Sequence, residues 1–105
     1  MEEKITSGLQ YFVIIGKTKL REKFATMLIE NGAHSIDTIY GRGSVGKSIL
    51  AQALGLDGEQ KKVIISCLLP TDNAKKVIDI LYDEFNFHKA NTGVAFSVPI
   101  EKLLF

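Results

Sequence analysis

Residues 62–85, KVIISCLLPTDNAKKVIDILYDEF, decide the fold, because a strand-like run passes directly into a helix-like one. Residues 62–69 are mostly β-branched and aliphatic and end at Pro70, which predicts a buried strand. Thr71 is placed to cap a helix, and Asp72 suits the positive first turn of that helix. Apolar residues then recur at helical spacing: Ala74, Val77, Ile78, Leu81, Tyr82 and Phe85. The other face of this helix is charged and is expected to be solvated: Lys75, Lys76, Asp79, Asp83 and Glu84.

A second strand–helix pair precedes this one. Residues 11–15, YFVII, form an unbroken β-branched and aromatic run closed by Gly16, which predicts a strand buried on both faces. Thr18 is placed to cap the following helix, and the pair Asn31-Gly32 is placed to end it. One apolar stripe supports this helix: Leu20, Phe24, Met27 and Leu28.

Shorter signals complete the order of elements. Residues 35–40 alternate and predict a second strand, and residues 94–98 predict a final strand with Pro99 at its end. Residues 1–8 show no period and are interpreted as a short leader or an extra edge of the sheet. The order predicts a single α+β domain over residues 1–105, with a ferredoxin-like βαββαβ fold and a four-stranded antiparallel sheet. Because the strands are apolar on both sides, we expect another subunit to cover the second face of the sheet.

Composition limits the kinds of partner. The chain has 105 residues, of which 46% are hydrophobic and 24% are charged, as in an ordinary globular domain. A formal net charge of +1 gives no overall attraction to nucleic acid or to an anionic membrane. Residues 1–4 are acidic where a signal peptide would be basic, and no apolar stretch approaches the roughly 20 residues that span a bilayer. We therefore expect a cytoplasmic protein without membrane insertion.

The longest stretch without a clear pattern is residues 41–60, between the second and third predicted strands. Loops of this length are uncommon in a compact domain unless they are functional or mobile, so we expect a mobile segment. Residues 41–48, GRGSVGKS, match the pattern G-x-x-x-x-G-K-S, which is typical of the phosphate-binding loop of nucleotide hydrolases.

Three features count against a nucleotide hydrolase. The chain is too short for a multi-stranded parallel sheet, the predicted strand at residues 62–69 ends in Pro70 rather than in an aspartate for Mg²⁺, and the helix after the motif would stop by Gly55. A weaker role stays open, in which a glycine-rich loop with Arg42 and Lys47 holds an anion.

Three segments resemble the PII signal-transduction (nitrogen regulatory protein P-II) family, in its shorter, divergent PII-like branch. They are residues 32–43 (GAHSIDTIYGRG), residues 62–65 (KVII) and residues 91–100 (NTGVAFSVPI), of which the last is the most specific. The resemblance covers nearly the whole chain from Leu9 and agrees with the predicted order of elements. It implies a homotrimer of ferredoxin-like subunits whose sheets line a central core.

The resemblance also implies a ligand site and a target-binding arm. Residues 41–60 correspond to the family's T-loop, a mobile arm that docks on target proteins such as a transporter, an enzyme or a regulator. Adenine nucleotides, with 2-oxoglutarate in many members, bind in clefts between subunits, against the base of the T-loop and a second loop called the B-loop. The ligand shifts the population of T-loop geometries and so changes which target fits. The usual setting is nitrogen metabolism.

Carried over by position, the effector site takes glycines and polar side chains from both loops. The candidate residues are Gly41, Arg42, Gly43, Lys47, His88, Lys89, Asn91, Thr92 and Gly93. Glycines allow the backbone to approach a phosphate closely, and Arg42 can pair with a phosphate bidentately. Alternatively, Gly41 and Gly43 serve only to shape a turn.

The chain departs from the family pattern at several positions. Val94 stands where the family's B-loop has a phosphate-binding lysine, and the sequence to Phe105 lacks the family's C-terminal arginines. The T-loop is shorter than usual and contains no tyrosine, so the uridylylation site has no counterpart. The glutamine after the first T-loop arginine is also missing, which weakens the expectation of Mg²⁺-dependent 2-oxoglutarate binding. The expected ligand is ATP, ADP or AMP, and no cofactor is required.

The remaining chemistry-bearing and exposed residues give fewer signals. Four residues of the long loop are predicted to contact a target protein, the alternative being a short helix packed on its own subunit: Ser44, Leu50, Leu54 and Leu56. Cys67 lies in an apolar run and is predicted to be a buried structural thiol. His34 and His88 are the only histidines and lack metal-ligand spacing, so no metal site is predicted. No nucleophile has a base beside it, so no enzyme is predicted.

Three functions remain open. The first is a non-enzymatic, homotrimeric PII-like regulator that binds a small effector between subunits and controls a target protein through residues 41–60. The second is a phosphate-binding-loop nucleotide hydrolase, for which Lys47→Ala would abolish both binding and turnover. The third is a trimeric ferredoxin-like metal-tolerance protein, which would bind metal through surface carboxylates and would be indifferent to nucleotides.

Overall fold

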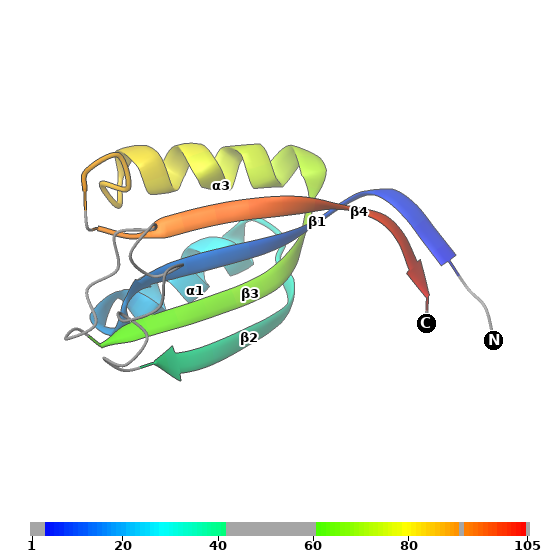
Figure 1. The fold of residues 1–105 in the computed structure, drawn as a ribbon. Helices are drawn as coiled ribbons and strands as arrows, with labels where there is room; N and C mark the ends of the chain where they lie inside the picture. Colours follow the sequence, from blue (N-terminus) through cyan, green and yellow to red (C-terminus); the bar gives the residue numbers. More distant parts are fainter. Residues whose placement is uncertain (1–3, 42–60, 91, 105) are drawn as a thin grey trace.

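The computed structural model describes residues 4–41, 61–90 and 92–104, and its elements follow the predicted order (Figure 1). The strands are β1 (Lys4–Lys17), β2 (His34–Gly41), β3 (Lys62–Pro70) and β4 (Val94–Leu104). The helices are η1 (Thr18–Leu20), a short 3-10 turn, α1 (Arg21–Glu30) and α3 (Thr71–Asp83). The strands form one antiparallel sheet in the order β2-β3-β1-β4. The prediction of a ferredoxin-like α+β fold is confirmed.

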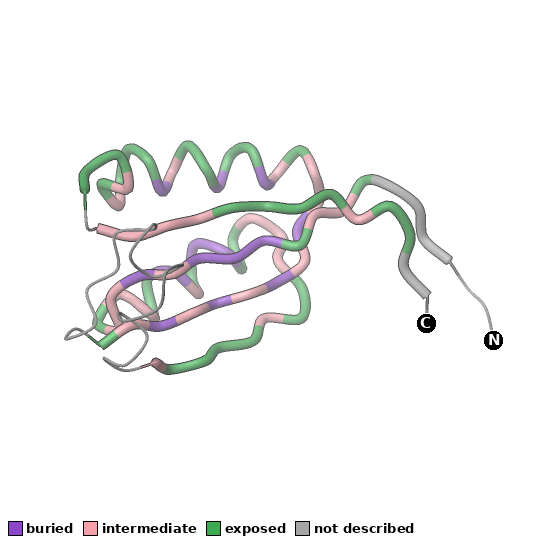
Figure 2. The backbone as a smooth tube through the Cα atoms, in the orientation of Figure 1, coloured by how far each residue is buried: buried purple, intermediate pink, exposed green. Residues whose placement is uncertain are grey.

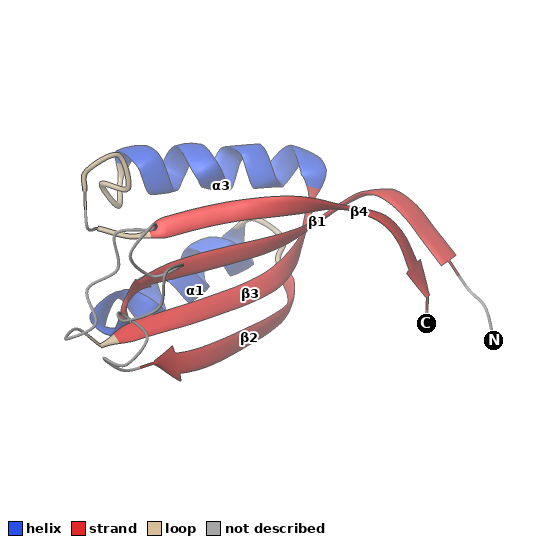
Figure 3. Cartoon of the chain, in the orientation of Figure 1, coloured by secondary structure: helices blue, strands red, loops and turns tan. Residues whose placement is uncertain are grey.

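The core lies between the sheet and the two helices. Alternate residues of β3 are buried on the helix side: Val63, Ile65, Cys67 and Leu69. They form one cluster with Phe12 and Ile14 of β1 and with the inner faces of both helices. The buried helix residues are Phe24, Met27 and Leu28 in α1 and Ala74, Val77 and Leu81 in α3. Buried positions concentrate in the two central strands and on the inner helix faces (Figure 2), which gives the molecule its two layers (Figure 3).

The opposite face of the sheet is largely apolar, with Asp37 and Ser66 as polar exceptions, and the helix residues of the core cluster pack on the other side. We call it the open sheet face, made of Tyr11, Val13, Ile15, Ile39, Ile64, Leu68, Val94, Phe96 and Val98, which alternate with the core residues. Ile39 is 59% exposed, and Tyr11 and Phe96 are each 44% exposed. The prediction that the strands are apolar on both sides therefore holds for the two central strands, β1 and β3, whereas the edge strands also carry polar residues such as Asp37 and Ser97.

The outer strands are longer than the sequence predicts. β1 begins at Lys4 rather than at Tyr11 and continues past an irregularity at Gly8, whose φ is +83°. Residues 4–8, interpreted from the sequence as part of a leader or an extra edge of the sheet, belong to this strand. Pro99 does not end β4, which runs on to the end of the described chain. Because β4 is an edge strand, the missing N–H of a proline costs no bond within the sheet interior.

Both predicted helix N-caps are wrong. α1 starts after Leu20 and α3 starts after Pro70, and neither residue makes a side-chain capping hydrogen bond. Thr18 lies one turn earlier, in η1. The Thr71 hydroxyl instead accepts a hydrogen bond of 3.2 Å from the Gln10 side-chain amide, so it fastens the start of α3 to β1.

The end of α1 follows the sequence, but the predicted apolar stripes extend beyond the helices: Leu20 lies in η1, and Phe85 lies after the end of α3. α1 is followed by Gly32 with φ +83°, and the Gly32 N–H donates to the Ile29 carbonyl at 3.1 Å, as the Asn31-Gly32 pair predicts. In α3, however, Ile78 is 38% exposed and Tyr82 is 57% exposed, so the buried stripe is narrower than predicted. No helix in the described residues is long and apolar enough to cross a membrane.

The narrow stripe of α3 predicts different costs for two matched truncations. Leu81→Ala, at a side chain that is 1% exposed, should lower the free energy of unfolding by about 2–5 kcal/mol, because a cavity remains. Ile78→Ala, at a half-exposed position of the same helix, should cost about 1 kcal/mol or less. Urea denaturation followed by circular dichroism measures both, and equal losses would contradict the assigned stripe.

Candidate functional site

All four strands have one end on the side of the sheet that lies away from the two chain termini (Figure 1). β1 and β2 end there, and β3 and β4 begin there. The register pairs both Lys17 and Gly41 with Lys62, and it pairs Ile15 with Val94. We call this side the loop end of the sheet; it comprises residues 15–17, 41, 61–62 and 92–94. The antiparallel topology therefore gathers here the two glycine-containing turns of the predicted effector site.

Within one chain, those two turns lie at opposite edges of the loop end. Gly41 closes β2 and Gly93 precedes β4, so β3 and β1 stand between them. With about 4.8 Å between neighbouring strands, the two glycines are roughly 14 Å apart. One ligand can contact both turns of a single chain only if it extends over that distance.

Several predicted residues fall outside the described part of the chain. These are Arg42, Gly43, Ser44, Lys47, Leu50, Leu54, Leu56 and Asn91. Of the G-x-x-x-x-G-K-S motif only Gly41 is described, and it ends a strand of an antiparallel sheet. A phosphate-binding loop belongs to a strand–loop–helix unit of a parallel sheet, so the topology argues against the hydrolase hypothesis.

Gly93 sits where the chain passes very close to an anchored aromatic ring. A Cβ added at Gly93 would lie 2.5 Å from Phe87 Cζ and 2.9 Å from the carbonyl oxygen of Ile15. Phe87 is held in turn, because its N–H donates to the Leu81 carbonyl at 3.0 Å and its ring meets Phe24 edge-on at 5.9 Å. Glycine at this position lets the turn before β4 lie directly against the core.

His88 is fixed to the end of α3. Its Nδ1 lies 2.7 Å from the carbonyl oxygen of Tyr82, and the two rings contact each other at a tilt of 41° with centroids 5.0 Å apart. A hydrogen on Nδ1 makes this contact a hydrogen bond and leaves Nε2 available. His88 and Lys89 are both exposed, on the loop that leads to Gly93. Both remain candidates for a ligand contact.

A basic pocket at the loop end was not predicted from the sequence. A cavity of about 500 Å³ is lined by Lys17, Thr18, Lys19 and Lys61. The first three belong to the turn from β1 into α1, and Lys61 immediately precedes β3. The Thr18 N–H donates to the Lys61 carbonyl at 3.4 Å and joins the two segments. The only sequence signal was the clustering of lysines at residues 17–19 and 61–62, which are far apart along the chain.

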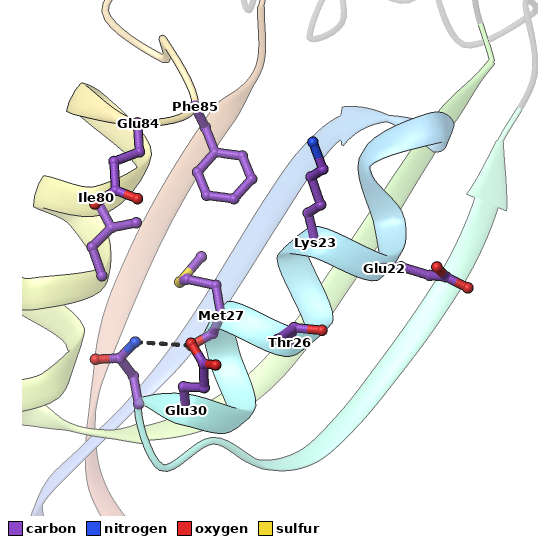
Figure 4. Close-up of a pocket in the computed structure, with 9 residues that line it drawn as sticks. Glu22, Lys23, Thr26, Met27, Glu30, Ile80, Glu84 and Phe85 are labelled. Carbon is purple, nitrogen blue, oxygen red and sulfur yellow. Dashed lines mark hydrogen bonds between the residues drawn. The ribbon is translucent and has the colours of Figure 1, made fainter.

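A second pocket, of about 540 Å³, lies between α1 and α3 (Figure 4). Met27, Ile80 and Phe85 contribute apolar side chains, and the Asn31 amide donates to the Met27 carbonyl at 2.8 Å. Its charged lining residues are Glu22, Lys23, Glu30 and Glu84. Three carboxylates against one ammonium disfavour an anionic effector, so the effector is not assigned to this pocket.

The described residues offer little for covalent or metal chemistry. Cys67 is 1% exposed, and burial raises the pKa of its thiol to about 11, so the thiol is protonated at neutral pH and is no nucleophile. The prediction of a buried thiol is confirmed. In residues 4–41, 61–90 and 92–104 no cluster of three His, Cys, Asp or Glu side chains is suited to a metal ion.

The fold is similar to that of PII-like proteins of known structure. CPII from Thiomonas intermedia K12, a nitrogen regulatory PII-like protein in its apo form, matches with a TM-score of 0.73 at 14% identity, over 100% of this chain and 99% of that one. A putative PII-like signalling protein from Thermus thermophilus gives 0.69 at 15% identity, over 96% and 91% of the two chains. Arabidopsis thaliana PII bound to citrate gives 0.62 at 16% identity, over 90% and 79%.

Other structures of CPII hold ADP, AMP and acetate, or ADP, AMP and bicarbonate. No protein-family model matches this chain, and no curated protein matches its sequence. The chain thus has the fold of PII-like proteins over its whole length, and the fold implied by the sequence resemblance is confirmed.

The close approach at Gly93 predicts a stability difference between two glycines of the site. Gly93→Ala should lower the free energy of unfolding by about 1–3 kcal/mol, because the methyl group would displace the Phe87 ring or the Ile15 carbonyl. Gly41→Ala is the matched control. Its Cβ would have Lys62 O as nearest atom at 4.0 Å, and it should change stability by less than about 0.5 kcal/mol. Thermal and urea unfolding measure both, and an unaffected Gly93→Ala would refute this packing.

Proposed function

We propose that the chain is a divergent PII-like signalling protein that forms a homotrimer, binds an adenine nucleotide and controls a target protein without catalysing a reaction. The observation that carries the proposal is the full-length match to PII-like folds, joined to an open sheet face of the kind that self-association would cover. Solvent-exposed apolar surface of this extent is typical of an interaction site.

The open sheet face supports association through the sheets. Its central positions, Ile15, Ile64 and Leu68, stand on the two middle strands, and both edge strands add exposed apolar side chains. A domain of this size buries only part of its surface when folded alone, so covering this face would add substantially to the core. Three copies with their open sheet faces turned inward would achieve this, as the resemblance implies.

The nucleotide is supported by two kinds of observation. CPII, which shares the fold, is recorded with ADP and AMP. In this chain the loop end presents Gly41 and Gly93 together with exposed basic side chains. Since the two glycines lie at opposite edges of one subunit, a cleft between subunits is the natural place for the ligand. Residues 41–60 act on the target as the T-loop, and we place the protein in the cytoplasm and in nitrogen metabolism by analogy with the family.

Oligomeric state is predicted to depend on the open sheet face. Light scattering should give about 35 kDa, three chains of 11.6 kDa each. Ile39→Asp, at a residue that is 59% exposed on this face, should dissociate the trimer, because a carboxylate cannot be buried there without a partner. Ile29→Asp is the matched control, at a residue that is 63% exposed on α1, and it should leave the trimer intact. A monomeric wild-type protein would refute the proposal.

Ligand binding is predicted to involve nucleotide without turnover. Calorimetric titration with ATP, ADP and AMP, with and without Mg²⁺ and 2-oxoglutarate, should show saturable binding of about one nucleotide per chain. Phosphate release should stay at background, since no described residue pairs a nucleophile with a base. Failure of all three nucleotides to bind would remove the nucleotide part of the proposal while leaving the trimer standing.

A further inference from the structure

The side of the sheet that faces away from the helices carries a small polar group at its β2 edge. His34 lies opposite Leu68, and Asp37 lies opposite Ser66, in the register of β2 with β3. Residues directly opposite each other in a ladder have their side chains on the same face. Leu68 and Ser66 alternate with the core residues of β3 and so lie on the open side. His34 and Asp37 therefore lie on the open side as well, and both are exposed.

A bulge in β2 brings these two residues to the same face. In a regular strand, residues three positions apart lie on opposite faces. Between His34 and Asp37, however, β2 has two residues where β3 has one. Ile36, inside this bulge, packs against the core, and Ser35 has φ +54°, in the left-handed region that residues other than glycine rarely adopt. The strand thus contains a strained residue at the point where its polar side chains are redirected.

His34 is the titratable residue nearest to Asp37 on the four-stranded part of this face. Their ladder partners are two positions apart on β3, so about 7 Å of strand separates the two rows. The charged positions Lys17 and Lys62 lie at the loop end, about 13 Å from the row of Asp37. Tyr11 lies on β1, two strands away from β2. Among the described residues, neither the His34 nor the Asp37 side chain has a hydrogen-bond or ion-pair partner.

A second copy of the chain that covers the open sheet face also covers this pair. A carboxylate loses its hydration when it is covered, and the loss is costly unless an opposite charge lies close to it. When His34 is neutral, Asp37 leaves one uncompensated negative charge on the face, and when His34 is protonated the two charges balance. An imidazole changes its charge between pH 5 and 8, whereas carboxylates generally stay ionised there.

We propose that His34 and Asp37 make self-association through the open sheet face proton-dependent, with tighter association when His34 is protonated. The inference rests on the proposed function, because it needs a second copy of the chain on this face. The sign follows from linkage, since protons that bind the assembled chains more tightly than the separate chains favour assembly as the pH falls. Association therefore strengthens between pH 7.5 and pH 6.0.

The test measures the midpoint concentration of trimer dissociation at pH 7.5 and at pH 6.0, by light scattering on a dilution series of the full chain. The wild-type midpoint should be about fivefold lower at pH 6.0. His34→Gln cannot gain the charge and should give the same midpoint at both pH values. Asp37→Asn leaves the protonated imidazole without a counter-charge, so its midpoint should be higher at pH 6.0, the reverse of the wild type.

His88→Gln is the matched control for the imidazole. His88 is the other histidine of the chain, and it is exposed on the loop before β4 rather than on the open side of the sheet. This variant should keep the fivefold effect of the wild type. Thermal unfolding at both pH values verifies the fold of each variant, and substitutions at these exposed positions should change it little.

The outcomes separate this proposal from the proposed function. A wild-type trimer with equal midpoints at the two pH values would overturn the proton dependence and leave the trimer standing. A pH effect that persists in His34→Gln, or that His88→Gln removes, would also overturn it. A wild-type protein that stays monomeric at every concentration and at both pH values would overturn the proposed trimer, and with it this inference.

Discussion

The pairing of β1 with β3 is the constraint on which the rest of the structure depends. Nine residue pairs, from Leu9 with Pro70 to Lys17 with Lys62, hold these strands side by side at the centre of the sheet. Because both strands are apolar at successive positions, each face of their ladder is apolar. Two helices can cover only one of these faces. The same pairing that builds the core therefore also creates the open sheet face.

The ladder also determines what the loop end can do. Since β1 and β3 run in opposite directions, the turn that leaves β1 lies beside the segment that enters β3. Lys17, Lys19 and Lys61 are thereby brought around one cavity although more than forty positions separate the last of them from the others. The edge strands, by contrast, hold Gly41 and Gly93 apart. At the loop end, the lysines therefore lie at the central strands, and the two glycine turns lie at the edge strands.

The sequence predicts those features whose cause is local. The spacing of apolar residues reflects which side chains are buried. The strands, both helices and the end of α1 at Gly32 could therefore be predicted from the sequence alone. The N-cap prediction at Thr71 failed where a distant partner is involved: Gln10, 61 positions away, donates a hydrogen bond to the Thr71 hydroxyl. The prediction at Thr18 failed because a 3-10 turn, Thr18–Leu20, precedes α1. Pro99 was taken as a strand end because sheet order, which makes β4 an edge, is not visible in a local pattern.

The candidate site could also be predicted only in part, because contacts between residues far apart in the sequence leave no local pattern. Gly41, Gly93, His88 and Lys89 were named as candidates by their position in the resemblance to the PII family, and as site residues they stay predictions. The cavity lined by Lys17, Thr18, Lys19 and Lys61 has no local pattern, because these residues come together only once the β1–β3 register is fixed. The PII-like proteins of similar fold share only 14–17% sequence identity with this chain, so the fold is kept although most residues differ. The apolar alternation that sets the ladder tolerates exchange among aliphatic residues, whereas the groups that contact a ligand are free to move to other positions of the same sheet end. Residue-for-residue correspondence alone therefore does not identify which side chains at the loop end of this sheet contact an effector.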